Sequence, residues 1–213
     1  MKGRFITIEG VEGVGKSTNL RFIEGYLKAR NITSISTREP GGTVLAERIR
    51  QVLLDKAEIS MDPFAELLLM FAARKQHTEE LIKPALARGD WVICDRYTDS
   101  SYAYQGGGRG IDSKHIASIE KLTLGNFKPD LTLILDLPVK TGLMRAGKRG
   151  ELDRFEIENE KFFGRVRATF LARARTNKRY HVINASQSLK SVQARIATVL
   201  ETLPALKVPA KRT

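Results

Sequence analysis

This chain of 213 residues has little cysteine and no long apolar run, and each of these features excludes a class of protein. The one cysteine, Cys94, provides no disulfide framework, and its place in the apolar run Trp91–Cys94 predicts a buried strand thiol rather than a reactive one. No apolar run approaches about 18 residues and no charged-then-apolar leader opens the chain, so we expect neither a membrane span nor a signal peptide. We therefore expect a soluble, cytoplasmic protein.

Acidic residues are few relative to basic ones: 24 Asp and Glu against 36 Lys and Arg give a formal net charge of +12. Such an excess suits nucleic acid, a membrane surface or an anionic small substrate. The basic residues gather at Arg145–Arg149, Arg165–Arg179 and Lys207–Arg212, rather than in one stripe interleaved with aromatics as in single-strand binders. Nucleic acid is therefore a disfavoured partner, and we interpret residues 204–213 as a solvated basic tail.

No linker, repeat or low-complexity stretch divides the chain, and its length suits one α/β domain over residues 1–213. Short apolar runs alternate with amphipathic stretches, which predicts a parallel five-stranded sheet with right-handed crossovers and helices on both faces. The expected strands are Phe5–Ile8, Ser34–Thr37, Trp91–Cys94, Leu131–Leu137 and Tyr180–Ile183. The expected helices are Ser17–Arg30, Val44–Leu54, Pro63–Ala87, Ser113–Leu124, Val139–Ala146, Glu158–Arg175 and Leu189–Leu203.

The stretch after the first expected strand matches the phosphate-loop pattern Gly-x-x-x-x-Gly-Lys-Ser/Thr and leads directly into a helix. In such a loop, glycines let successive N–H groups point inward at a helix N-terminus, where the dipole also favours an anion. We expect Lys16 to reach the terminal phosphates of a nucleoside triphosphate and the Ser17 hydroxyl to hold Mg²⁺. This predicts the P-loop NTPase fold, with the nucleoside triphosphate bound by Gly10, Val11, Glu12, Gly13, Val14, Gly15, Lys16, Ser17 and Thr18.

Charged and turn-forming residues follow the other expected strands, at the carboxyl ends where ligands of open parallel sheets bind. Asp95 is placed to hold Mg²⁺ or its water shell, and Arg96 to clamp a phosphate bidentately. The alternative is an Asp–Arg pair that caps a strand end. We expect four such segments to converge on the phosphate loop: Thr37–Thr43, Asp95–Tyr97, Asp136–Pro138 and Asn184–Ser186.

Four more segments allow both a structural and a functional interpretation. Residues 40–42, Pro-Gly-Gly, form either a turn that opens a helix or part of a pocket. Residues 67–71 are more typical of core than of pocket, although Arg74 beyond them can add a hydrogen bond to base stacking. Residues 100–110 are either a flexible loop or a set of groups that read a base edge. Residues 145–156 suit a short mobile lid that brings positive charge to a phosphoryl group, or else a solvated helix end.

Taken in order, these segments resemble thymidylate kinase, of the bacterial type whose lid supplies catalytic cations. The resemblance runs from about Phe5 to Asn184 and includes Ala103–Asp112 and Arg149–Arg154 besides the segments above. It implies transfer of the γ-phosphoryl group of ATP to dTMP, with Mg²⁺, by a homodimer whose interface uses the stretches 63–87 and 113–124. The alternative from another class is a non-catalytic P-loop module that binds nucleotide or nucleic acid.

The resemblance also implies roles for individual residues. Arg74 hydrogen-bonds the thymine edge, while Arg50 and Arg96 hold the acceptor phosphate. The place of the base-stacking aromatic falls on Met70, with Phe71 one residue later, so either side chain stacks. The other implied substrate-binding residues are Glu12, Arg38, Pro40, Ser100, Ser101, Tyr104 and Gln105; the implied catalytic cations are Lys16, Arg96, Arg145, Lys148 and Arg149; and the implied metal ligands are Ser17 and Asp95.

Overall fold

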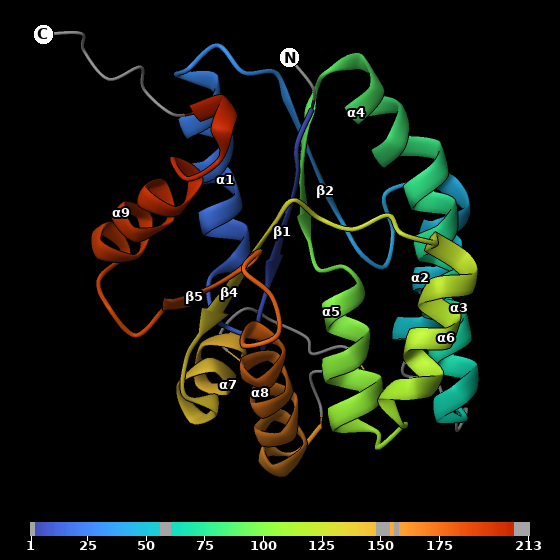
Figure 1. The fold of residues 1–213 in the computed structure, drawn as a ribbon. Coiled ribbons are helices and arrows are strands. Elements are labelled where there is room, and N and C mark those ends of the chain that lie inside the picture. Colours follow the sequence, from blue (N-terminus) through green and yellow to red (C-terminus); the bar gives the residue numbers. More distant parts are fainter. Residues whose placement is uncertain (1–2, 56–60, 148–153, 156–157, 207–213) are drawn as a thin grey trace, which may run out of the picture.

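The computed structural model describes residues 3–55, 61–147, 154–155 and 158–206 (Figure 1). Within these residues one parallel sheet forms, in the strand order β2-β3-β1-β4-β5. All five expected strands are present, with bounds that differ by one residue at the carboxyl end. They are β1 (Phe5–Glu9), β2 (Ser34–Arg38), β3 (Trp91–Asp95), β4 (Leu131–Asp136) and β5 (Tyr180–Asn184).

The helices begin close to the expected positions, and several have side-chain caps at their N-termini. Asp62 accepts hydrogen bonds from the N–H groups of Phe64 and Ala65, and Pro63 occupies the first turn, where no N–H is needed. The helices are α1 (Lys16–Lys28), α2 (Val44–Leu54), α3 (Pro63–His77), α4 (Lys83–Arg88), α5 (Thr98–Ser101), α6 (Ser113–Leu124), α7 (Val139–Gly147), α8 (Glu160–Ala174) and α9 (Leu189–Leu200).

The expected helix 63–87 is continuous but not uniformly α-helical. A π-helical turn, Thr78–Ile82, separates α3 from α4. Pro84 lies in the first turn of α4 and lacks the N–H that an unbroken α-helix would need there. The π-helical turn ends two residues before Pro84, so the helix leaves the regular α-helical hydrogen-bond pattern next to the residue that cannot donate.

Residues 98–108 were not predicted as helical, yet they form α5 followed by the π-helical segment Tyr102–Gly108. The flexible-loop interpretation of this stretch is therefore wrong. A Cβ at Gly107 would lie 2.1 Å from Thr169 Oγ1, and one at Gly108 would lie 2.4 Å from the Phe162 ring. The glycines thus let α8 pack closely against this segment, and tertiary packing overrides their low helix propensity.

The core lies on both faces of the sheet, as the alternation of strands and helices predicted. Ile6 of β1 packs with Ile23 of α1 in one cluster, which extends to α8 and α9. Phe5 packs with Cys94 and Phe71 in a second cluster beneath α3, α4 and α6. The Cys94 thiol is buried, and burial raises its pKa well above the ordinary value, in keeping with the expectation of an unreactive strand cysteine.

The strand order places β1 between β3 and β4, so the loop after β1 begins in the middle of the sheet. Ile8 pairs with Asp95, and Asp95 in turn pairs with Arg38, so the carboxyl ends of β1, β3 and β2 lie side by side. Among the described residues, no helix combines the length and apolarity that crossing a membrane requires.

Candidate functional site

The phosphate loop joins β1 to α1 and depends on glycine at each sharp turn. Gly10, Gly13 and Gly15 all have positive φ. A Cβ at Gly13 would lie 2.0 Å from the carbonyl oxygen of Gly142 on α7, so only glycine allows the two backbones to approach. The Lys16 ammonium donates to the carbonyl oxygens of Gly10 and Val11 at 3.3 and 3.2 Å, which holds it over the loop.

The loop lines a polar hollow, which we call the loop pocket. Its wall includes the predicted ATP-binding residues 12–18; Gly10 and Val11 do not line it, but their carbonyl oxygens accept hydrogen bonds from Lys16. Arg38, Arg50, Arg96 and Arg145 also line it, so arginines surround the loop. Burial and the charge of Arg96 lower the pKa of Lys16, against the effect of the nearby acids. Basic side chains outnumber the three acids Glu12, Glu39 and Asp95 in this lining, so the loop pocket is cationic on balance.

Ser17 and Asp95 line the loop pocket at the positions predicted for metal ligands. Asp95 Oδ1 is buried without a hydrogen-bond partner, and such an oxygen needs a donor or a cation. Among the described residues, no group of three or more His, Cys, Asp or Glu side chains is arranged so that it could hold a metal ion. The Ser17 hydroxyl and the Asp95 carboxylate together fit Mg²⁺, which keeps several waters and takes its other ligands from one or two carboxylates and substrate phosphates.

Arg96 lies where β3 gives way to α5, and its φ of 72° is unusual for a residue other than glycine. Its guanidinium donates to Gly10 O at 3.0 Å and to Glu12 Oε2 at 2.5 Å. Burial alone would raise the pKa of Glu12, but Arg96 and Lys16 outweigh it and lower this pKa. Arg96 therefore faces the loop as a fixed cation, held in a strained backbone conformation by its contacts.

A second pocket adjoins the first, and we call it the Arg74 pocket. It is lined by the predicted residues Glu12, Pro40, Arg50, Met70, Arg74, Arg96, Ser100, Ser101, Tyr104 and Gln105. Arg38 does not line it; this side chain lies in the loop pocket and pairs with Glu47 at 3.0 Å.

Met70 and Phe71 lie on different sides of α3. Met70 lines the Arg74 pocket, whereas Phe71 is 1% exposed and belongs to the core cluster beneath α3. The guanidinium of Arg74 stacks over the Phe71 ring, 4.6 Å from its centroid. Phe71 thus supports Arg74 from behind, and Met70 is the side chain that can lie against a ligand.

Arg74 is fully buried but holds three hydrogen bonds. It donates to Glu39 at 2.6 Å, to Ser101 Oγ at 2.9 Å and to the carbonyl oxygen of Tyr97 at 3.0 Å. Burial would lower the pKa of Arg74, but Glu39 outweighs it, so the side chain stays charged. These contacts fix a planar donor at the wall of the pocket.

Three lining residues of the Arg74 pocket, Glu39, Leu54 and Phe155, were not among the predicted site residues. Glu39 lies inside the segment 37–43, where a carboxylate beside Pro-Gly-Gly gave a signal that could have been used. Phe155 and Leu54 are apolar and gave none. Phe155 follows Arg154, whose guanidinium donates to Leu53 O at 2.9 Å and to Glu66 Oε2 at 2.7 Å.

The two pockets share four charged residues: Glu12, Glu39, Arg50 and Arg96. We call these the shared wall. Arg50 is tied to the turn after β2 by a hydrogen bond of 2.8 Å to Pro40 O. A ligand in either pocket therefore lies next to the same charges.

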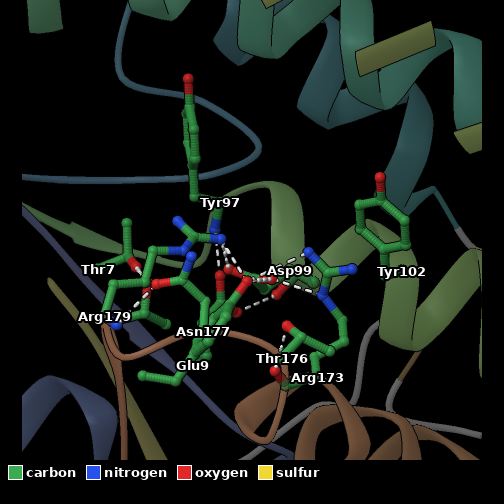
Figure 2. A network of polar contacts seen from close by, with 12 residues as sticks. Thr7, Glu9, Tyr97, Asp99, Tyr102, Arg173, Thr176, Asn177 and Arg179 are labelled. Atoms are coloured by element: carbon green, nitrogen blue, oxygen red, sulfur yellow. Dashed lines mark hydrogen bonds and ion pairs between the residues drawn. The ribbon is translucent and has the colours of Figure 1, made fainter. Parts of the chain in front are cut away.

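Figure 2 shows a buried polar network around Glu9 of β1 and Asp99 of α5. Asp99 accepts hydrogen bonds from Arg173 at 2.5 Å, Tyr180 at 2.8 Å and Arg179 at 3.2 Å. Glu9, at the end of β1, accepts from the Tyr97 N–H at 2.7 Å and from Ser100 Oγ at 2.6 Å. Because Ser100 also contacts Arg96, these two acids fix the turn that carries Arg96.

Two of the four strand ends expected to converge on the phosphate loop contribute no residue to either pocket. Neither residues 136–138 nor residues 184–186 line the two pockets. Asp136 is held in a bidentate pair by Arg167 of α8, and Asn184 accepts from the Ser186 N–H. Both follow strands on the side of β1 away from β3 and β2.

The predicted lid and tail are described only in part. Arg145 ends in the loop pocket from the last turn of α7, as a lid cation would. Lys148 and Arg149 lie outside the described residues, as do residues 207–213 of the basic tail.

The parallel sheet and the loop pocket define a P-loop protein that binds a nucleoside triphosphate. A family model described as thymidylate kinase matches residues 8–196. The chain belongs to the thymidylate kinase family.

Individual relatives agree with this assignment. The chain is 56% identical over 204 residues to a thymidylate kinase of Pseudomonas fluorescens strain SBW25, covering 95% of this chain and 97% of that protein. It is also 56% identical to one of Teredinibacter turnerae strain ATCC 39867 / T7901, covering 94% of this chain and 98% of that protein. A crystal structure of thymidylate kinase from Ehrlichia chaffeensis matches with a TM-score of 0.75 and 35% identity, over 94% of this chain and 99% of that one.

Proposed function

We propose that this chain transfers the γ-phosphoryl group of ATP to the 5′-phosphate of dTMP, giving ADP and dTDP for nucleotide biosynthesis in the cytoplasm. The observation that carries the proposal is the shared wall between the loop pocket and the Arg74 pocket. A protein that only binds ATP needs one pocket. A transferase needs a second, placed so that the acceptor meets the terminal phosphate of the donor.

In this assignment, the protein contributes positioning and charge neutralisation, because phosphoryl transfer has a loose transition state and little covalent chemistry for side chains. Lys16 neutralises the terminal phosphates from the loop, and Arg145, with Lys148 and Arg149, adds cations from the lid. Mg²⁺, held by Ser17 and Asp95, would neutralise charge on the phosphate oxygens. Arg96 and Arg50 hold the acceptor phosphate, whose oxygen is mostly ionised at neutral pH and needs no general base.

The base occupies the far end of the Arg74 pocket. Thymine presents a carbonyl oxygen, O4, as an acceptor, and Arg74 only donates. Met70 lies against the ring, Pro40 shapes the pocket around the 5-methyl group, and Gln105 completes the set of polar groups.

We also propose a homodimer that forms through α3 and α6. These helices pack on each other, with the Phe64 ring 5.5 Å from that of His115. They leave large apolar side chains exposed: Leu68 at 53% and Leu122 at 87%. Light scattering of the purified protein should give twice the chain mass, and Leu122→Lys should shift it toward the monomer.

The test is ADP release from ATP and Mg²⁺ with dTMP, dUMP, dCMP, dGMP or AMP as acceptor. We expect release to depend on dTMP and to fall by about a thousandfold or more in Lys16→Ala, because a positioned cation contributes that much to phosphoryl transfer. Lys28→Ala, on the exposed end of the same helix, should retain full activity. Folded protein that binds ATP but releases no ADP with any acceptor would refute the kinase and favour a binding module.

A further inference from the structure

Three polar side chains lie one behind another next to Arg74: Glu39, His77 and Thr37. Arg74 Nε donates to Glu39 Oε2 at 2.6 Å, His77 Nδ1 lies 3.0 Å from Glu39 Oε1, and Thr37 Oγ1 lies 2.8 Å from His77 Nε2. His77 is 0% exposed and Glu39 4% exposed. In the function proposed above, Arg74 is the residue of this group that contacts the base, and neither His77 nor Thr37 has a role.

Every contact in this chain has a donor and an acceptor that suit each other. A carboxylate only accepts, so His77 donates its Nδ1–H to Glu39. In the neutral imidazole Nε2 is then an acceptor, and the Thr37 hydroxyl donates to it. Glu39 is therefore held at both oxygens, by His77 on one and by Arg74 on the other, so it cannot rotate away from the guanidinium.

The backbone of Gly42 packs directly on the contact between His77 and Thr37. A Cβ at this position would lie 2.5 Å from His77 Nε2 and 2.6 Å from Thr37 Oγ1, and Gly42 also has a φ of 89°. Only glycine fits here. The Pro-Gly-Gly segment thus turns the chain and also packs on the buried side of the Arg74 pocket.

We propose that Thr37, His77 and Glu39 act as positioning residues for Arg74, and that they set how strictly the pocket selects thymine over cytosine. This rests on the proposed function, since selection requires a base beside Arg74. Cytosine presents an amino donor where thymine presents O4. A guanidinium never accepts a hydrogen bond, so a guanidinium fixed against this position of the base disfavours cytosine. If the guanidinium is free to turn away, cytosine is no longer excluded.

The experiment compares KM and kcat for dTMP, dCMP and ATP in His77→Leu and the parent protein. Removing the imidazole leaves Glu39 Oε1 buried without a donor and frees the carboxylate. We expect KM for dTMP to rise about tenfold, the effect of losing roughly one good hydrogen bond, and the dTMP preference over dCMP in kcat/KM to fall by a similar factor. KM for ATP should change much less than KM for dTMP, because Arg74 lines only the Arg74 pocket.

Two further variants separate positioning from simple packing. His77→Asn keeps an amide N–H near the place of Nδ1, so it should restore most of the dTMP preference. His181→Leu removes a histidine from β5, at the opposite edge of the sheet from β2, and should behave as the parent. Where His77→Leu does not fold, Thr37→Val tests the same contacts with a side chain of equal shape.

Arg74→Lys, measured in parallel, distinguishes the two proposals. If Arg74→Lys loses dTMP preference while folded His77→Leu keeps it, the positioning role is overturned and the proposed function stands. If His77→Leu lowers kcat for dTMP and dCMP equally without changing KM or the preference, the positioning role is likewise overturned. If Arg74→Lys changes neither KM for dTMP nor the preference, Arg74 does not read the base, and both assignments to this pocket fail.

Discussion

Glu9 provides a test of the electrostatics behind the shared wall. It is fully buried at the end of β1, and burial, aided by the charge of Asp99, raises its pKa from 4.5 to about 8 despite hydrogen bonds from Ser100 and Tyr97. In the unfolded chain the pKa of Glu9 has its ordinary value of 4.5. Between these two values the folded protein holds a proton that the unfolded chain releases, so the free energy of unfolding falls as pH rises.

Within that pH window the free energy of unfolding falls by about 1.4 kcal/mol per pH unit. From pH 4.5 to about pH 8, the whole loss from Glu9 is on the order of 5 kcal/mol. The substitution Glu9→Gln removes this pH-dependent loss of stability, because an amide does not titrate in this range. Its carbonyl still accepts from the Tyr97 N–H, and its NH₂ group can donate to Ser100 Oγ. We expect the stability of Glu9→Gln relative to the parent to improve by about 3 kcal/mol between pH 5.5 and pH 8.5.

The assay is urea unfolding at pH 5.5, 7.0 and 8.5, at one protein concentration, followed by the fluorescence of the buried Trp91. Glu79→Gln is the matched control. Glu79 is exposed, and hydrogen bonds from Lys75 and Lys83 lower its pKa, so its contribution is lost only on acidification below this range. If the difference between Glu9→Gln and the parent is the same at all three pH values, Glu9 is ionised in the folded protein and the reasoning is refuted.

Three other changes have distinct expected outcomes. Met70→Ala should weaken dTMP binding in calorimetry with little effect on ATP, because Met70 lines the Arg74 pocket; equal weakening of both would contradict this. Phe71→Ala should lower the free energy of unfolding by about 3–5 kcal/mol, as large core deletions do; a loss below about 1 kcal/mol in chemical denaturation would place Phe71 outside the core. Gly108→Ala puts a Cβ 2.4 Å from the Phe162 ring, so overpacking should cost about 1–3 kcal/mol; unchanged stability would mean that α8 moves aside freely.

The parallel sheet and the phosphate loop were predictable because each leaves a local signature. Strands appear as short apolar runs, and the loop combines glycines with Lys16 and Ser17 at fixed spacing. Residues 98–108 leave no such signature: three consecutive glycines argue against a helix, and only the packing of α8 against Gly107 and Gly108 makes one possible.

The choice between Met70 and Phe71 could not be made from the sequence for a different reason. Adjacent residues point about 100° apart on a helix, and both faces of α3 are apolar near this point. Which face meets the pocket depends on how α3 sits on the sheet. Likewise, Asp136 lies at the carboxyl end of a strand, as a ligand-binding residue would. Its pairing with Arg167 forms only when α8 packs beside β4.

In the proposed function, the shared wall makes the two nucleotide sites energetically dependent on each other. Arg96 and Glu12 pair with one another at the boundary, so an anion in either pocket changes the field that the other ligand meets. Thermodynamic linkage then requires reciprocity: the factor by which one nucleotide alters the affinity for the second equals the factor in the reverse direction. Dissociation constants measured with a single nucleotide therefore describe the binary complexes alone, and the ternary complex has affinities of its own.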